Sequence, residues 1–248
     1  MDRFVYVAMT GAREAQLAQA VASHNLANAS TTAFRATLAA SEHVGLAGPG
    51  HAAARAYAVT QGYGVDLTPG PLQATGRDLD IAIDGEGWLA VQAPDGGEAY
   101  TRAGDLEVDA FGLLTTRAGL PVLGEGGPIA LPPFESLEIG IDGTISIRPP
   151  GQDAAGLVVV DRIRLVNPPA ADLRRGPDGL LRMADGLPPP APAADVRVRS
   201  GMLEGSNVNV VSAMVEMIEH ARDFELQVKL MSTAEENDRA SAALMRLP

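Results

Sequence analysis

The chain contains no cysteine, and this absence removes several kinds of site at once. Without thiols it can form no disulfide, no zinc–thiolate centre and no thiol nucleophile. Histidine is also scarce, because only four residues of this type occur and no two have the spacing of metal ligands. The sequence therefore predicts no metal site. The four histidines are interpreted as surface or helix-seam residues: His24, His43, His51 and His220.

Positive charge is in short supply as well. The chain has 19 basic and 31 acidic residues, which gives a formal net charge of −12. Lysine is almost missing, since Lys229 stands alone and arginine supplies the other basic side chains. A phosphate backbone would be repelled by this balance, so we expect no nucleic-acid partner.

Long hydrophobic runs are absent too. No stretch reaches the roughly 18 uncharged apolar residues that a membrane-spanning helix needs, so no membrane span is predicted. The first apolar run, "FVYVAM", is too short for the core of a signal peptide, and the charged residues Arg13 and Glu14 come soon after it. Aromatic residues make up only 4% of the chain. Alanine supplies much of the apolar content, and small side chains favour close packing of helices.

Proline is missing from the first thirty residues, and Gly11 is their only glycine. Apolar residues recur there at alternating spacings of three and four, with Gln19 as the exception, which predicts a helix to about Ala29. The small residues of this row form a heptad-like seam, for which we expect a packing partner. Its members are Val5, Ala8, Ala12, Ala15, Ala22 and Leu26.

A stronger heptad pattern occupies the C-terminal segment. It predicts a helix of roughly 35 residues, long enough to indicate a coiled coil or packing on other chains. Ser206 or Asn207 is the predicted N-cap, because both side chains can accept a hydrogen bond from the first helical turn. The seam has strict four–three spacing and consists of Val210, Met214, Met217, Ala221, Phe224, Val228 and Met231.

Between the two helices, short alternating runs and turn signals predict antiparallel strands. Asp-Gly pairs begin at residues 84, 95, 142, 178 and 185, and each suits a tight hairpin. The run "GLVVVDRIRLV" (156–166) is interpreted as a buried strand pair or one long strand. No helical run alternates with these strands, which argues against a parallel, doubly wound sheet.

The predicted fold class is α+β, with long terminal helices in a coiled-coil-like domain and a central all-β domain of short antiparallel strands. Four segments are expected. Residues 1–36 form the N-terminal helix and its turn, and residues 37–74 form an extended linker rich in glycine and alanine. Residues 75–199 form the central β-rich domain, and residues 200–248 form the C-terminal helix.

Catalytic motifs find little support. The run "DLDIAIDGEG" fails the EF-hand template, because Ala82 and Ile83 stand where oxygen ligands are needed. The glycines of "LGEGGPI" are not followed by Gly-Lys-Ser or Gly-Lys-Thr, and no Gly-x-Ser-x-Gly occurs. A glycosidase-like carboxylate pair depends on the fold and stays open. One alternative is therefore a β-rich cell-wall hydrolase with helical arms.

The stretch "NLANASTTAF" (25–34) ends the first predicted helix. Its amide and hydroxyl side chains can cap the helix and bond the turning backbone, and Phe34 supplies an apolar anchor for the exit. We interpret it as a junction between the helix and the central domain. The junction residues are Asn25, Asn28, Ser30, Thr31, Thr32 and Phe34.

Three motifs, taken in chain order, resemble those of a known protein family. "NLANASTTAFRA", the central segment from "TGRDLDIAIDGEGWLAV" to "RAGLPVLG", and the segment from "GMLEGSNV" to "ALMRL" together resemble the flagellar rod and hook family of axial proteins. The resemblance implies terminal helices packed as a coiled coil in an inner tube, with the β-rich domain further out. It implies a structural role, with no catalytic, cofactor-binding or metal-binding residues and no small-molecule substrate.

Within that family the start "MDR", the length and the end "LMSTAEENDRASAALMRL" are most similar to the proximal-rod member. That member is a subunit of the drive shaft of the basal body, which carries torque across the periplasm. The implied partners are other proximal-rod subunits, the distal-rod protein and the flagellar export apparatus. Export would use the flagellar type III apparatus without cleavage of a signal peptide. A distal-rod subunit of the same family is the second alternative.

The sequence departs from the family motif at one position. Ala33 stands where the family usually has glycine. We therefore expect the turn before Phe34 to be less left-handed here than in the family.

Overall fold

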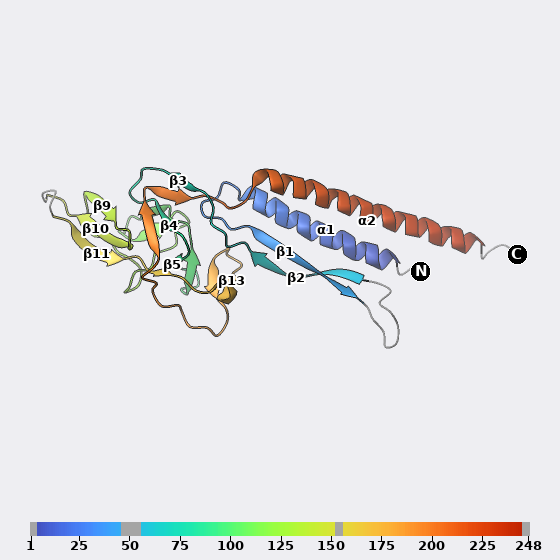
Figure 1. Cartoon of the computed structure of the whole chain (residues 1–248), viewed down its shortest axis with the longest axis horizontal. Coiled ribbons are helices and arrows are strands. Elements are labelled where there is room, and N and C mark those ends of the chain that lie inside the picture. Colours follow the sequence, from blue (N-terminus) through green and yellow to red (C-terminus); the bar gives the residue numbers. More distant parts are fainter. Residues whose placement is uncertain (1–3, 46–55, 152–155, 245–248) are drawn as a thin grey trace. The chain divides into compact units, whose positions relative to one another are not determined.

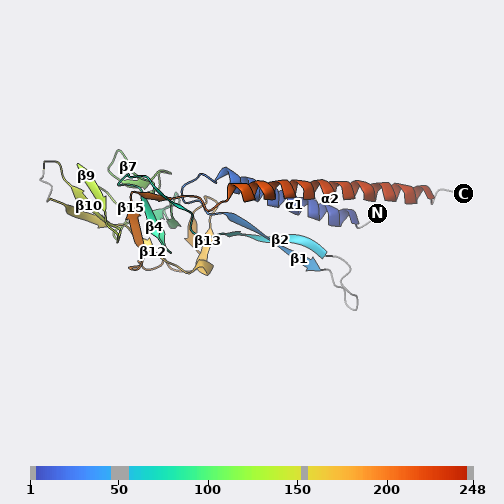
Figure 2. The same ribbon diagram turned by 45° about the horizontal axis from the view of Figure 1, so that its top comes forward.

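The computed structural model describes residues 4–45, 56–151 and 156–244 (Figures 1 and 2). The chain divides into two compact units. The helical unit comprises residues 1–29, 36–66 and 208–248, and the central unit comprises residues 30–35 and 67–207.

The helical unit is built on two helices, α1 (Phe4–Ala27) and α2 (Val210–Leu244), which lie side by side in both views (Figures 1 and 2). The 35 residues of α2 confirm the long C-terminal helix. Its N-cap is Asn209, however, and not Ser206 or Asn207. The Oδ1 atom of Asn209 accepts hydrogen bonds from the backbone N–H groups of Val211 (3.0 Å) and Ser212 (3.1 Å), as an N-cap should.

Small side chains let the two helices approach closely. The only buried residues of α2 are Ala213 and Ala234, among those the structure describes. A Cβ atom on Gly11 of α1 would lie 2.8 Å from Cδ of Gln227 of α2, closer than such carbons normally come. Four alanines of the predicted N-terminal seam are buried, namely Ala8, Ala12, Ala15 and Ala22.

The structure places a β-hairpin in the segment for which the sequence predicts an extended linker. Strands β1 (Thr37–Gly45) and β2 (Ala56–Val65) pair antiparallel with a bulge after Ala40, and both contact α1. Asn25 of α1 fixes the start of the hairpin, because its amide donates to the Thr37 carbonyl (2.9 Å) and accepts from the Thr37 N–H (2.8 Å). Alanine and glycine hide the alternation of these strands, which is why composition pointed to a linker.

The central unit contains only short strands, and all pairings among the described strands are antiparallel. This confirms the expected all-β region. The strands are β3 (Leu72–Ala74), β4 (Ile81–Asp84), β5 (Trp88–Gln92), β6 (Glu98–Thr101), β7 (Leu106–Val108), β8 (Leu114–Thr116), β9 (Ser136–Ile139), β10 (Thr144–Arg148), β11 (Val158–Arg162), β12 (Leu165–Val166), β13 (Leu173–Arg175), β14 (Leu181–Met183), β15 (Arg197–Ser200) and β16 (Met202–Glu204), with a 3₁₀ turn η1 (Ala170–Asp172).

One hydrophobic core joins the small sheets of this unit. Five strands form the largest sheet, in the order β12-β5-β6-β14-β13, and three form the sheet β11-β10-β9. Three of the predicted Asp-Gly turns close hairpins, at Gly96, Gly143 and Gly179, each with a φ of 83° that glycine adopts without strain. Gly85 and Gly186 also have positive φ, but the strands around them pair elsewhere.

The run 156–166 differs from the prediction of a buried strand pair. It forms β11 and β12, which belong to different sheets. Strand β12 is buried, whereas β11 is an edge strand whose Val159 is 64% exposed. Hydrophobicity alone does not reveal which strand lies at an edge.

Candidate functional site

The three motifs that carry the family resemblance meet at one buried carboxylate, that of Glu204. This side chain is fully buried and lies between two buried arginines, Arg35 and Arg102. Arg35 donates through Nη2 to Oε1, and Arg102 donates through Nη1 to Oε2 at 3.0 Å. The backbone N–H of Gly70 also donates to Oε1, at 2.8 Å. Segments from the start, middle and end of the chain are therefore joined at a single group.

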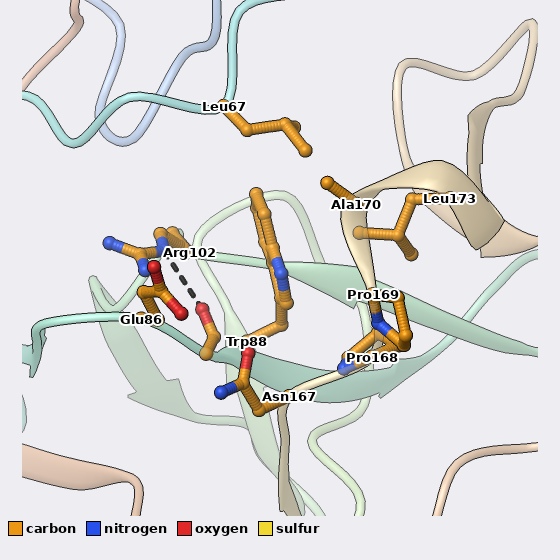
Figure 3. Close-up of a pocket in the computed structure, with 10 residues that line it drawn as sticks. Leu67, Glu86, Trp88, Arg102, Asn167, Pro168, Pro169, Ala170 and Leu173 are labelled. Carbon is orange, nitrogen blue, oxygen red and sulfur yellow. Dashed lines mark hydrogen bonds between the residues drawn. The ribbon is translucent and has the colours of Figure 1, made fainter.

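Trp88 lies against both cations. The guanidinium carbons of Arg35 and Arg102 are 5.8 and 5.2 Å from the centre of its ring, within the range of a cation–π interaction. Arg102 also donates to the carbonyls of Gly87 (2.8 Å; dashed in Figure 3) and Gly85 (2.6 Å). The run "DGEG" thus supplies carbonyl acceptors for an arginine, which accounts for the turn that first invited a calcium interpretation.

The cluster of Arg35, Arg102 and Glu204, called the charge cluster below, holds two cations and one anion. Burial lowers the pKa of Arg102, and the neighbouring Glu204 carboxylate opposes that shift. The Nε and Nη1 atoms of Arg35 are buried without a hydrogen-bond acceptor among the described residues. Since unpaired buried charge is costly, Glu204 is the group on which the cluster depends.

A slot of about 290 Å³ opens beside Trp88 in the central unit. Figure 3 shows the indole ring with Leu67 above its upper end and with Ala170, Leu173 and the Pro168–Pro169 pair along its right side. Glu86 and Asn167 lie at the polar side of the slot. Apolar lining with a few polar groups is typical of a binding pocket.

Side-chain amides and backbone groups of the junction motif form hydrogen bonds to neighbouring segments. The Asn28 amide donates to the carbonyl of His24 (2.9 Å) at the end of α1. Ala33 N–H donates to the Glu204 carbonyl (2.8 Å), and Asn207 N–H donates to the Phe34 carbonyl (3.2 Å). Phe34 packs under the guanidinium of Arg175, at 5.1 Å. Ser30 and Thr31 are exposed, and Thr32 is half-buried.

Ala33 has a φ of 54°, so the expectation of a less left-handed turn is wrong. It is the only residue other than glycine with a positive φ in the described part of the chain. The hydrogen bond from its N–H to the Glu204 carbonyl holds the turn in place. The left-handed geometry therefore survives without glycine, at the cost of strain between Cβ and the backbone.

Replacement of Ala33 by Gly should raise the free energy of unfolding, by about 1 kcal/mol, because glycine adopts this φ without strain. Urea unfolding followed by circular dichroism measures the change. Ala20→Gly, on an exposed position of α1, is the matched control and should lower stability by about 1 kcal/mol. Equal losses in both variants would show that Ala33 is not strained.

The predicted seam residues fall into two groups in the single chain. On α1, Val5 and Leu26 are half-buried beside the four buried alanines. On α2, Met217, Ala221 and Met231 are half-buried, but four others are exposed: Val210, Met214, Phe224 and Val228. A single helix pair therefore leaves much of the α2 row uncovered, and contact of that row with neighbouring chains stays a prediction.

The open question of a catalytic carboxylate pair can be examined at Asp80 and Asp105, which form an isolated β-bridge. Each is paired with an arginine: Asp80 with Arg77 at 3.2 Å, and Asp105 with Arg117 at 4.0 Å. Neither residue lines the slot beside Trp88. The pair therefore has the character of a structural contact and not of a substrate site.

The pH dependence of folding stability tests the role of Asp105. Burial raises its pKa, and the Asp80 charge adds to that effect, while its backbone hydrogen bond and Arg117 oppose it. A carboxyl whose pKa is higher in the folded state binds its proton more tightly there, so folding gains stability as the pH falls through that pKa. Asp105→Asn should remove this gain. The free energy of unfolding of the Asp105→Asn variant, relative to that of the parent, should be highest near neutral pH and should decline in acid. Urea unfolding at several pH values measures this difference. A difference independent of pH would contradict the assignment.

Sequence reasoning missed the charge cluster and Trp88. The available signals were weak: Arg35 directly follows the junction motif, and Trp88 is the only tryptophan of the chain. Arg35 and Glu204 are separated by 169 positions, and Arg102 and Glu204 by 102. No local pattern pairs residues at such distances.

Comparison with protein families gives three matches in chain order. Residues 5–35 match the model "Flagella basal body rod protein", and residues 82–147 match "Flagellar hook protein FlgE/F/G D1 domain". Residues 199–244 match "Flagellar basal body rod FlgEFG protein C-terminal". Each segment contributes one member of the charge cluster: Arg35, Arg102 and Glu204.

Individual relatives match over nearly the whole chain. The chain is 44% identical to the flagellar basal-body rod protein FlgF of Escherichia coli, with 96% of each chain covered. It is 42% identical to FlgF of Salmonella typhimurium over the full length of both. The rod protein FlgG of Bacillus subtilis is 32% identical, with 95% of this chain and 96% of that protein covered. Over the described residues, no helix combines the length and hydropathy that a membrane span requires.

Proposed function

Since the chain belongs to the FlgF family of flagellar basal-body rod proteins and is a structural subunit of the rod and not an enzyme, we propose that it packs in the proximal part of the rod. There it would form part of a helical array that transmits torque across the periplasm. The identity to FlgF of Escherichia coli (44%) and of Salmonella typhimurium (42%), against 32% to FlgG of Bacillus subtilis, favours the proximal over the distal rod.

The uncovered apolar row on α2 is the observation that carries this proposal. Met214 is 49% and Val228 43% exposed, although both belong to a regular heptad seam. Such a row on a helix that already packs on α1 requires further helices for its burial. Contacts between unlike surfaces of successive subunits generate an open helical filament, as a shaft requires, when the rotation between subunits does not close into a ring. Neighbours in the array would be other rod subunits of the proximal segment and, at its end, the distal-rod protein.

We also propose that the chain reaches the rod through the flagellar type III apparatus. Passage through a narrow export channel demands an unfolded chain, and a sequence without cysteine cannot be trapped by disulfides. A secretion assay in cells that lack a functional flagellar export apparatus tests this route. Appearance of the chain in the periplasm of such cells would rule it out.

Replacement of both Met214 and Val228 by Asp tests the assembly surface. Because both side chains are exposed in the single chain, the variant should fold with unchanged helix content. Charge at the buried centre of a helix interface costs several kcal/mol, so rods should not assemble. Cells that express only this variant should not swim, and their isolated basal bodies should lack the protein.

Ser212→Asp is the matched control, because it adds charge at another exposed position of α2. It should leave swimming close to that of the parent. Normal swimming by the Met214→Asp, Val228→Asp double variant would contradict the proposed seam.

A further inference from the structure

An exposed aromatic side chain lies on the turn between β7 and β8. Phe111 is 89% exposed, the highest value among the large hydrophobic residues described. The turn that carries it is firmly held, because the Asp109 carboxylate accepts hydrogen bonds from the N–H groups of Phe111 and Leu113, both at 2.8 Å. A rigid and exposed aromatic ring is typical of the anchor of a protein interface, since little conformational entropy is lost when it binds.

Gly112 adds to the rigidity of this turn. Its φ is 83°, and a Cβ atom there would lie 2.6 Å from the Leu131 carbonyl oxygen. The backbone therefore has no room to shift towards the core. The turn therefore holds Phe111 at a fixed place on the surface, with its ring exposed to solvent.

The slot beside Trp88 has the size and chemistry to receive such a ring. Its volume is about 290 Å³, and an apolar cavity of about 150 Å³ is enough to bind benzene. Leu67, Pro169 and Leu173 supply apolar walls, and the accessible edge of the largely buried Trp88 ring, 6% exposed, completes the lining (Figure 3). Arg102 and Glu86 border the slot and would remain beside the polar edge of the contact.

Phe111 and the slot belong to the same central unit. Figure 2 shows β7, which leads into the Phe111 turn, at the upper edge of that unit, and β13, which begins with the slot residue Leu173, at its lower right. The two surfaces differ in shape, so a contact between them joins unlike faces of two molecules. A head-to-tail contact of this kind builds a filament when the rotation between successive copies does not close into a ring.

We propose that Phe111 of one copy of this chain inserts into the Trp88 slot of the next copy. This contact deepens the proposed rod assembly and rests on it, because it adds a head-to-tail link between central units to the packing of the helices. The second copy is the chosen occupant, since the chain carries both the anchor and a slot of matching size and apolar character.

Site-specific cross-linking tests the contact, and the lack of native cysteine makes the result easy to assign. Ala110 is exposed beside Phe111, and Ala170 is exposed at the rim of the slot. Full-length Ala110→Cys protein is mixed with affinity-tagged Ala170→Cys protein and treated with a short bis-maleimide. The expected result is a cross-linked dimer that contains one copy of each variant.

Two further substitutions in the Ala110→Cys background control the experiment. Phe111→Asp should lower the yield of the mixed dimer about tenfold, because loss of a central anchor has at least that effect on affinity. Ile141→Asp changes another exposed apolar residue, 65% exposed, and should leave the yield unchanged. Equal yields with and without Phe111, or equal loss with Ile141→Asp, would overturn the proposal. If these variants still enter basal bodies while no cross-link forms, the central-unit contact fails and the proposed rod function stands.

Discussion

Replacement of Glu204 by Gln is expected to lower the free energy of unfolding by about 3–5 kcal/mol, because it leaves two buried guanidinium groups without a counter-charge. Glutamine keeps the shape of the side chain and its oxygen can still accept from Gly70 and Arg35, but its NH2 group then faces the Arg102 donor, so the loss combines the missing charge with one lost hydrogen bond. Trp88 lies against both arginines and is the only tryptophan. The fluorescence of Trp88 during urea unfolding therefore reports the loss of structure at the charge cluster.

A second substitution separates charge balance from a packing defect. Arg35→Met in the Glu204→Gln background removes one uncompensated cation and should recover a large part of the lost stability. The control is Glu135→Gln, which breaks an exposed ion pair with Arg148 (3.7 Å) and should cost less than about 1 kcal/mol. If the double variant is no more stable than Glu204→Gln alone, the charge cluster does not act as described.

Replacement of Ala12 by Asp should have a similarly large effect on the helical unit. Ala12 is 6% exposed in a row of buried alanines, where close packing leaves little room for a carboxylate. Burial of an unpaired charge costs several kcal/mol, so we expect a loss of about 3 kcal/mol or more. Far-ultraviolet circular dichroism during heating should show that helix content is lost at a lower temperature than in the parent.

The matched control for that prediction lies on the same helix. Ala20→Asp makes the same chemical change at an exposed position of α1 and should cost less than about 1 kcal/mol. Similar losses from Ala12→Asp and Ala20→Asp would show that the alanine row of α1 is not a packing surface.

Periodicity predicted the two helices well, because a heptad pattern sustained from Val210 to Met231 has few alternative explanations. It did not predict which face of α2 packs on α1. The buried positions of α2 are Ala213 and Ala234, one residue away from members of the predicted register or beyond its end. Larger apolar residues dominated the pattern, whereas close helix packing selects small ones. Where one helix packs against several neighbours, the sequence alone does not show which seam residue contacts which neighbour.

The remaining differences arise from contacts between distant residues. Residues 37–74 looked like a linker because alanine and glycine mask the alternation of β1 and β2, and an amide on another element, Asn25, sets where the hairpin starts. The charge cluster could not be predicted from the sequence, because its members also lie far apart in the chain. Its arginines look like ordinary surface charges until the fold places both of them on Glu204.

Accessibility of position 228 in the free and assembled states tests the central claim, that the exposed row of α2 becomes buried in the rod. In a chain without native cysteine, Val228→Cys can be labelled by a maleimide in the purified monomer and in isolated basal bodies. Asp95→Cys, on an exposed turn of the central unit, is the reference position. We expect rapid labelling of Cys at position 228 in the monomer and labelling slowed about tenfold or more in the rod, as burial in a packed interface requires. Equal labelling rates at position 228 in the monomer and in the rod would contradict it.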